Sequence, residues 1–70
     1  MKISYDPKVD ALYIEFEDTT VTTKHVAEGI SIDLDAHGKL AGIEVLNASK
    51  KFGDKSTLRH VTLDNIGLSA

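Results

Sequence analysis

The chain has 70 residues, a formal net charge of −3 at pH 7 and no cysteine. Single hydrophobic cores occupy on the order of 50 to 200 residues, so this length excludes a second domain and predicts one small domain over residues 1–70. The absence of cysteine excludes a disulfide scaffold, and no apolar run approaches the roughly 20 residues that cross a bilayer. No secretory signal is visible, so we expect a soluble, cytoplasmic protein.

A domain of this size is only marginally stable by itself. The free energy gained by burying apolar surface and the conformational entropy lost on folding nearly cancel. Small domains usually gain the additional stability from disulfides, a structural metal or association. This sequence has neither cysteines nor a zinc-ligand pattern. We therefore expect a homodimer.

The N-terminal part predicts two strands. Residues 2–5 alternate between apolar and polar types until Pro7, which lacks a backbone donor and presets φ for a turn. Residues 11–16 resume the alternation and place Leu12 and Ile14 on one face. A helix is the competing interpretation of this second stretch, but its aromatic and β-branched residues favour a strand.

The middle of the chain predicts an edge strand followed by a β-hairpin. Residues 20–26 are rich in β-branched types but alternate weakly, which is typical of an edge. Residues 30–34 and 40–46 flank Asp35-Ala36-His37-Gly38, a tetrapeptide typical of a type I turn with glycine where positive φ is needed. This hairpin is the strongest pattern in the sequence.

The second hairpin strand is apolar on both faces. Ile43 and Val45 fall on one side, whereas Leu40 and Leu46 fall on the other. Either Gly42 marks a bulge that shifts the phase, or a helix or another subunit covers the second face. Leu40 and Leu46 are therefore candidate interface residues.

The C-terminal part predicts one short helix over residues 47–52. Asn47 is a candidate N-cap, and Gly53 is a candidate stop. Residues 61–63 form a candidate further strand. Two apolar residues beyond it are expected to anchor the tail: Ile66 and Leu68.

Together these elements predict a mainly β domain. We expect a small antiparallel meander of about five strands with at most one short helix near residues 47–52. Six apolar residues are expected to form its core: Leu12, Ile14, Ile32, Leu34, Ile43 and Val45.

One constellation resembles a metal site. Asp33, Asp35, His37 and Glu44 follow the spacing of a calcium loop, in which oxygen ligands alternate and a glutamate at the twelfth position closes the shell. However, His37 stands where an oxygen ligand is needed, and calcium loops of this kind are flanked by helices. The turn residues by themselves explain the spacing. A metal-binding or small-ligand domain that uses these four residues is therefore the alternative interpretation.

Other functional classes find no support in the sequence. The serines lie in no nucleophile-elbow context, the three histidines are far apart, and the glycines form no phosphate loop. Catalysis and a cofactor are therefore not expected. Four cations lie in residues 47–60, namely Lys50, Lys51, Lys55 and Arg59. Because four cations in a short polar connection are more often a solvated loop than a phosphate-binding patch, nucleic-acid binding is not expected either.

Three stretches carry a resemblance to a known family. They are KISYDP at residues 2–7, DALYI at residues 10–14, and IDLDxxGKLxGIEVLNAS at residues 32–49. The chain resembles the small prokaryotic proteins grouped as domain of unknown function 2283, over residues 2–52. The resemblance implies a compact β-rich domain without an assigned activity, and it is compatible with an antitoxin-like, partner-binding role. We expect a protein-interaction module that associates with a second copy or with another protein.

Overall fold

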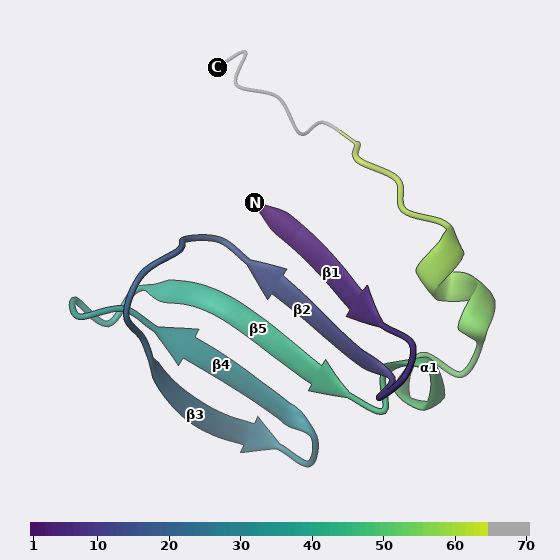
Figure 1. Ribbon diagram of the computed structural model, residues 1–70, viewed down its shortest axis with the longest axis horizontal. Helices are drawn as coiled ribbons and strands as arrows, with labels where there is room; N and C mark the ends of the chain where they lie inside the picture. The colour runs from purple at the N-terminus through teal and green to yellow at the C-terminus, as the bar shows by residue number, and fades with distance from the viewer. Residues whose placement is uncertain (65–70) are drawn as a thin grey trace.

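The computed structural model describes residues 1–64, except for the side chain of Lys55. Five strands form one antiparallel sheet (Figure 1), followed by a short α-helix and a 3-10 helix. The predicted mainly β fold with five antiparallel strands and one short α-helix is confirmed. The elements are β1 (Lys2–Asp6), β2 (Ala11–Glu15), β3 (Thr22–Ala27), β4 (Ile30–Leu34), β5 (Leu40–Leu46), α1 (Ala48–Lys51) and η1 (Lys55–Arg59).

The strand order differs from that of a meander. The sheet runs β1-β2-β5-β4-β3, so β5 lies between β2 and β4, and β3 is at an edge as its weak alternation predicts. The link from β2 to β3 passes the end of β5, where the amides of Phe16 and Glu17 both donate to the carbonyl of Ala41. The strand with apolar residues on both faces thus takes the central position, where both of its edges are paired.

The predicted turn at Asp35–Gly38 is confirmed, and a second turn at Glu28–Gly29 connects β3 to β4. Gly29 and Gly38 have φ values of 69° and 80°, a conformation that residues with a Cβ adopt only with strain. The carboxylate of Asp35 accepts hydrogen bonds from the amides of His37 and Lys39, each at 2.8 Å. Two backbone amides of the turn therefore donate to one carboxylate oxygen, which stabilises the turn.

The six predicted core residues lie on one face of the sheet, as the register shows. Leu12 pairs with Val45, and Ile14 pairs with Ile43, which in turn pairs with Ile32. Within residues 1–64, however, no large side chain is fully buried, and the buried hydrophobic residues are Ala41 and Ala48. The molecule is a single layer of sheet with principal extents of 35 × 33 × 19 Å. The predicted core is therefore a half-buried face.

A bulge resolves the two-faced pattern of β5. Asp33 pairs with Gly42, but the next residue of β4, Leu34, pairs with Leu40, so Ala41 is the extra residue. The bulge shifts the phase and brings Leu40 beside Leu34. A second register shift, between His25 and Ala27, lies on the edge strand β3.

Three C-terminal predictions need correction. Asn47 has a φ of 53° and its side chain caps nothing, because the backbone must turn sharply out of β5 before α1 begins. Residues 55–59 form a 3-10 helix where no element was expected, and the side chain of Asp54 caps it by accepting from the amide of Ser56 at 2.9 Å. Residues 61–63 are not a strand, because they pair with no sheet edge. Ile66 and Leu68 lie outside the described residues.

Candidate functional site

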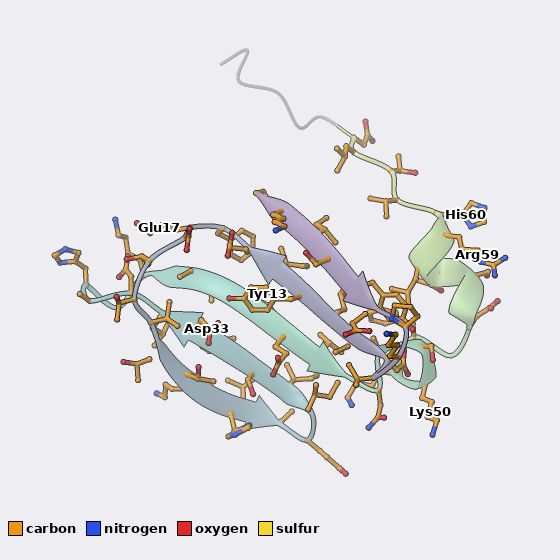
Figure 2. The ribbon with its side chains drawn as sticks, viewed as in Figure 1. Tyr13, Glu17, Asp33, Lys50, Arg59 and His60 are labelled. Atoms are coloured by element: carbon orange, nitrogen blue, oxygen red, sulfur yellow. The ribbon has the colours of Figure 1, made fainter. Side chains whose placement is uncertain are left out.

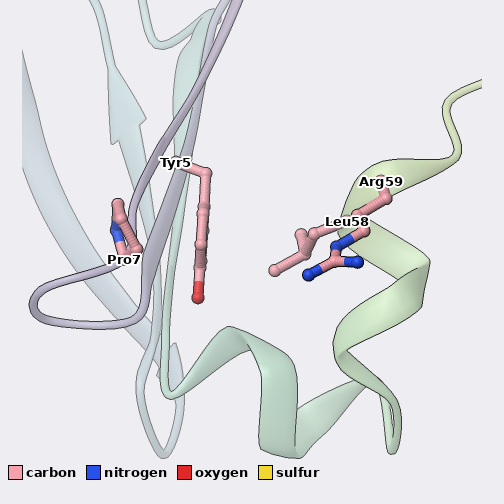
Figure 3. Close-up of a pocket in the computed structure, with 4 residues that line it drawn as sticks. All are labelled: Tyr5, Pro7, Leu58 and Arg59. Carbon is pink, nitrogen blue, oxygen red and sulfur yellow. The ribbon is translucent and has the colours of Figure 1, made fainter.

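The C-terminal residues cover only the part of the apolar face that lies near β1. Residues 47–61, here called the C-terminal segment, lie on the β1 side (Figure 1) and leave a hollow of about 440 Å³ against the face. Four side chains of β1 and β2 line this hollow, and the segment contributes Phe52, Thr57, Leu58 and Val61. A smaller hollow lies beside it between Tyr5, Pro7, Leu58 and Arg59 (Figure 3).

The rest of the apolar face, on β5, β4 and β3, has no second layer among residues 1–64. We call this surface the open patch. Lys24 is its one charged residue, placed opposite Ile32 on the edge strand. Its nine side chains are Thr22, Lys24, Ala27, Ile30, Ile32, Leu34, Leu40, Ile43 and Val45.

The C-terminal segment is tied to the β1–β2 turn through Asp10. The carboxylate of Asp10 accepts from the amide and the hydroxyl of Ser49, at 3.1 and 2.9 Å, and from the hydroxyl of Tyr5 at 2.6 Å. Its carbonyl accepts from the amide of Ala48 at 2.9 Å. Ala48 and Ser49 are buried, so the start of the segment has a fixed position against the sheet.

A hydrogen-bonded network spans the opposite, polar face. The phenol of Tyr13 on β2 lies across β5 and donates to Asp33 on β4 at 2.6 Å (Figure 2). The hydroxyl of Thr23 on β3 donates to the other oxygen of Asp33 at 2.6 Å. Gly42 lies beneath the phenol, because a Cβ at this position would stand 2.2 Å from the hydroxyl oxygen of Tyr13. One carboxylate therefore links strands from both halves of the sheet.

The pKa values of this network follow from its hydrogen bonds. The bond to Asp33, together with partial desolvation, raises the pKa of Tyr13 to about 12. The bonds from Thr23 and Tyr13 lower the pKa of Asp33 because they stabilise its ionised form. At neutral pH Tyr13 is therefore protonated and Asp33 is ionised, which is the arrangement of a structural hydrogen bond and leaves no group poised for proton transfer.

The four candidate metal ligands do not gather into a site. Asp33 is held by Tyr13 and Thr23 on the polar face, and Asp35 accepts from the turn amides. Glu44 lies on β5 opposite Ser31. Across residues 1–64 no three His, Asp or Glu side chains come close enough to hold a metal ion. The geometry therefore gives no support to the metal-binding alternative.

The two candidate interface residues lie at opposite ends of β5. Leu40 joins the open patch beside Leu34, whereas Leu46 pairs with Ala11 on the polar face. Their side chains are 43% and 41% exposed. They do not form one surface, and the larger apolar surface is the one that the sequence assigned to the core.

Sequence reasoning missed both of these hydrogen-bonded links between residues that are far apart in the sequence. Tyr13 is 20 residues from Asp33, and Asp10 is 39 residues from Ser49. One signal was available, because all four residues lie within the three stretches that carry the family resemblance. The structure thus explains parts of those stretches as contacts that hold the fold.

Comparisons with known proteins add a family assignment. No helix formed by residues 1–64 has the length and apolar character needed to span a membrane. No curated protein and no solved structure matches the chain. Residues 2–49 match the family described as "Protein of unknown function (DUF2283)", and the match ends at Ser49, the residue that hydrogen-bonds to Asp10. The chain belongs to the DUF2283 family of proteins of unknown function.

Proposed function

We propose that this protein is a small interaction module that associates with a second copy of itself through the open patch. The observation that carries the proposal is a sheet whose apolar face lacks a second layer. Domains usually bury the apolar face of a sheet against another layer, and no large side chain of residues 1–64 is fully buried. A second copy supplies the missing layer with a surface of matching chemistry.

The composition of the open patch favours a protein partner. Eight of its nine side chains are uncharged, and Lys24 lies at its rim, where its aliphatic stem can cover apolar surface while the ammonium group stays in water. Contiguous apolar surface of this kind typically marks an interaction site. The polar face, by contrast, is occupied by the Tyr13–Asp33–Thr23 network.

The sheet edges are less suited to association. The edge strand β3 carries a bulge next to His25 and a lysine at position 24, both of which hinder the addition of another strand. At the other edge, the C-terminal segment lies beside β1 (Figure 1). Association through the face is therefore favoured over strand addition.

The size of the open patch predicts a weak dimer. A standard interface uses about 20 to 30 residues from each partner, whereas the patch supplies nine and its immediate neighbours. We expect a dissociation constant in the micromolar range, which corresponds to about −8 kcal/mol. A heterologous, antitoxin-like partner and a cytoplasmic location remain predictions.

Light scattering coupled to size exclusion, over a concentration series that reaches millimolar, tests the proposal. We expect the mass to rise from 7.6 kDa toward twice that value. Val45→Asp, in the open patch, should abolish the rise. Leu46→Asp is the matched control, because it places the same charge on the adjacent residue but on the polar face. A wild-type chain that keeps the monomer mass throughout would refute self-association.

A further inference from the structure

The shape of the open patch specifies how two copies pack. We infer that β4 of one copy packs face to face on β4 of the other, around a two-fold axis that runs parallel to the strands and passes beside Ile32. This orientation rests on the proposed self-association. It follows from the symmetry of the surface and from the position of the C-terminal segment.

Symmetry identifies the central strand. In a two-fold dimer the same surface is used by both copies, so the residue at the centre of that surface meets its own equivalent. The open patch covers three strands, and β4 is the middle one. Ile32 is the middle residue of β4, with Lys24 on one side and Ile43 on the other. Ile32 is therefore the residue closest to the axis.

The C-terminal segment selects the direction of the axis. With an axis in the plane of the sheet but perpendicular to the strands, β1 of one copy would lie over β1 of the other, and the two segments would occupy the same space. With an axis parallel to the strands and centred on β4, β3 of each copy lies over β5 of its partner. Each segment then lies outside the partner's β3 edge, and no collision occurs.

The start of the segment is held in place by hydrogen bonds from the residues of α1. Ser49 and Ala48 are bound to Asp10, and the ammonium group of Lys51 donates to the carbonyl of Leu46 at 2.6 Å. In the inferred dimer the segment covers the β1 side of the apolar face, and the partner covers the β3 side. Together they bury a face that neither can cover by itself.

A spin label at position 4 measures the orientation directly. The chain has no cysteine, so Ser4→Cys provides a unique attachment point on the exposed polar face of β1. Ser4 is level with Ser31, the neighbour of Ile32, through the pairs Ser4–Tyr13, Tyr13–Glu44 and Glu44–Ser31. Its position relative to the proposed axis is therefore known.

The two orientations predict different label distances. Three strand spacings separate β1 from β4, so with sheets ~10 Å apart the parallel axis predicts about 31 Å between the two Cα atoms of position 4. The perpendicular axis predicts about 12 Å, because the two β1 strands would then stack. Electron–electron double resonance resolves this difference, although each label adds several ångströms.

The mass of the labelled protein separates the two hypotheses. A dimer with the long distance supports the inferred orientation. A dimer with a short distance overturns the orientation and leaves self-association standing, whereas a monomer at millimolar concentration overturns both. A second measurement uses Ile32→Cys with a short bismaleimide, which should link two copies covalently at concentrations where Ser4→Cys is not linked. A dimeric Ile32→Cys variant that fails to link also overturns the orientation.

Discussion

Replacing Gly42 by alanine tests whether the tyrosine above it determines the identity of this residue. The new Cβ would stand 2.2 Å from the hydroxyl oxygen of Tyr13 and 2.7 Å from its Cζ atom. Real Cβ atoms essentially never come this close to another atom, so the ring must move, and we expect its hydrogen bond to Asp33 to break. The carbonyl of Ile14, at 3.1 Å, requires a shift of only a few tenths of an ångström.

The expected loss of stability combines three contributions. A hydrogen bond to a charged group contributes about 1.5 to 3 kcal/mol when buried, and about 1 to 2 kcal/mol at this half-buried position. Displacing the ring from β5 costs about 1 kcal/mol of apolar contact. Alanine is favoured over glycine within a strand by about 0.5 to 1 kcal/mol, which offsets part of the loss. We expect Gly42→Ala to be destabilised by about 1 to 2.5 kcal/mol.

A double-mutant cycle with Tyr13→Ala isolates the contact between the two residues. Without the ring, Gly42→Ala should be neutral or slightly stabilising, which gives a coupling of about 2 kcal/mol. Urea denaturation of the four proteins at one fixed concentration measures it, since association would otherwise shift the midpoints. Equal destabilisation in both backgrounds would refute the reasoning and assign the effect to the backbone of β2.

The pKa of Tyr13 provides a second measurement in the same variants. In the wild type it is raised to about 12, so the protonated phenol stabilises the fold fully below the ordinary value of 10.0. This contribution is lost as the pH rises from 10 toward 12. Gly42→Ala should lower the pKa of Tyr13 toward 10, as followed by NMR of the ring. A pKa that stays near 12 would show that the hydrogen bond survives.

Three further predictions concern the links that hold the sheet and its turns. Ser49→Ala removes the hydroxyl that donates to Asp10 and should lower the free energy of unfolding, measured in urea, by about 1 kcal/mol. An unchanged urea midpoint would show that this hydrogen bond does not stabilise the fold. Gly38→Ala should lose about 1 kcal/mol through backbone strain alone, because φ is 80° and no atom lies near the added Cβ, and Gly38→Asn should lose less. Since hydrogen bonds lower the pKa of Asp33, its contribution to stability is present above its ordinary pKa of 3.8 and is lost as the pH falls below it. Between pH 7 and pH 2 the urea midpoint of Asp33→Asn should therefore fall less steeply than that of the wild type. Parallel curves for the two proteins would contradict the stabilising role of the Asp33 carboxylate.

The sequence by itself determined the local structure. Alternation over residues 30–34 and 40–46 predicted the hairpin strands, and glycine at position 38 predicted the turn between them. These features were readable because a strand repeats every two residues and a turn depends on a few adjacent residues. The shared face of the apolar residues follows from the same period.

Only the tertiary structure decided which distant residues meet and whether the apolar face is covered. The links from Tyr13 to Asp33 and from Asp10 to Ser49 depend on β5 lying between β2 and β4, and a strand order is not encoded in any local pattern. Alternation likewise shows that Ile32 and Ile43 share a face, but not what packs upon it. That face is half-buried because residues 1–64 form one sheet and a short C-terminal segment, and this segment contains too few residues to cover the whole face.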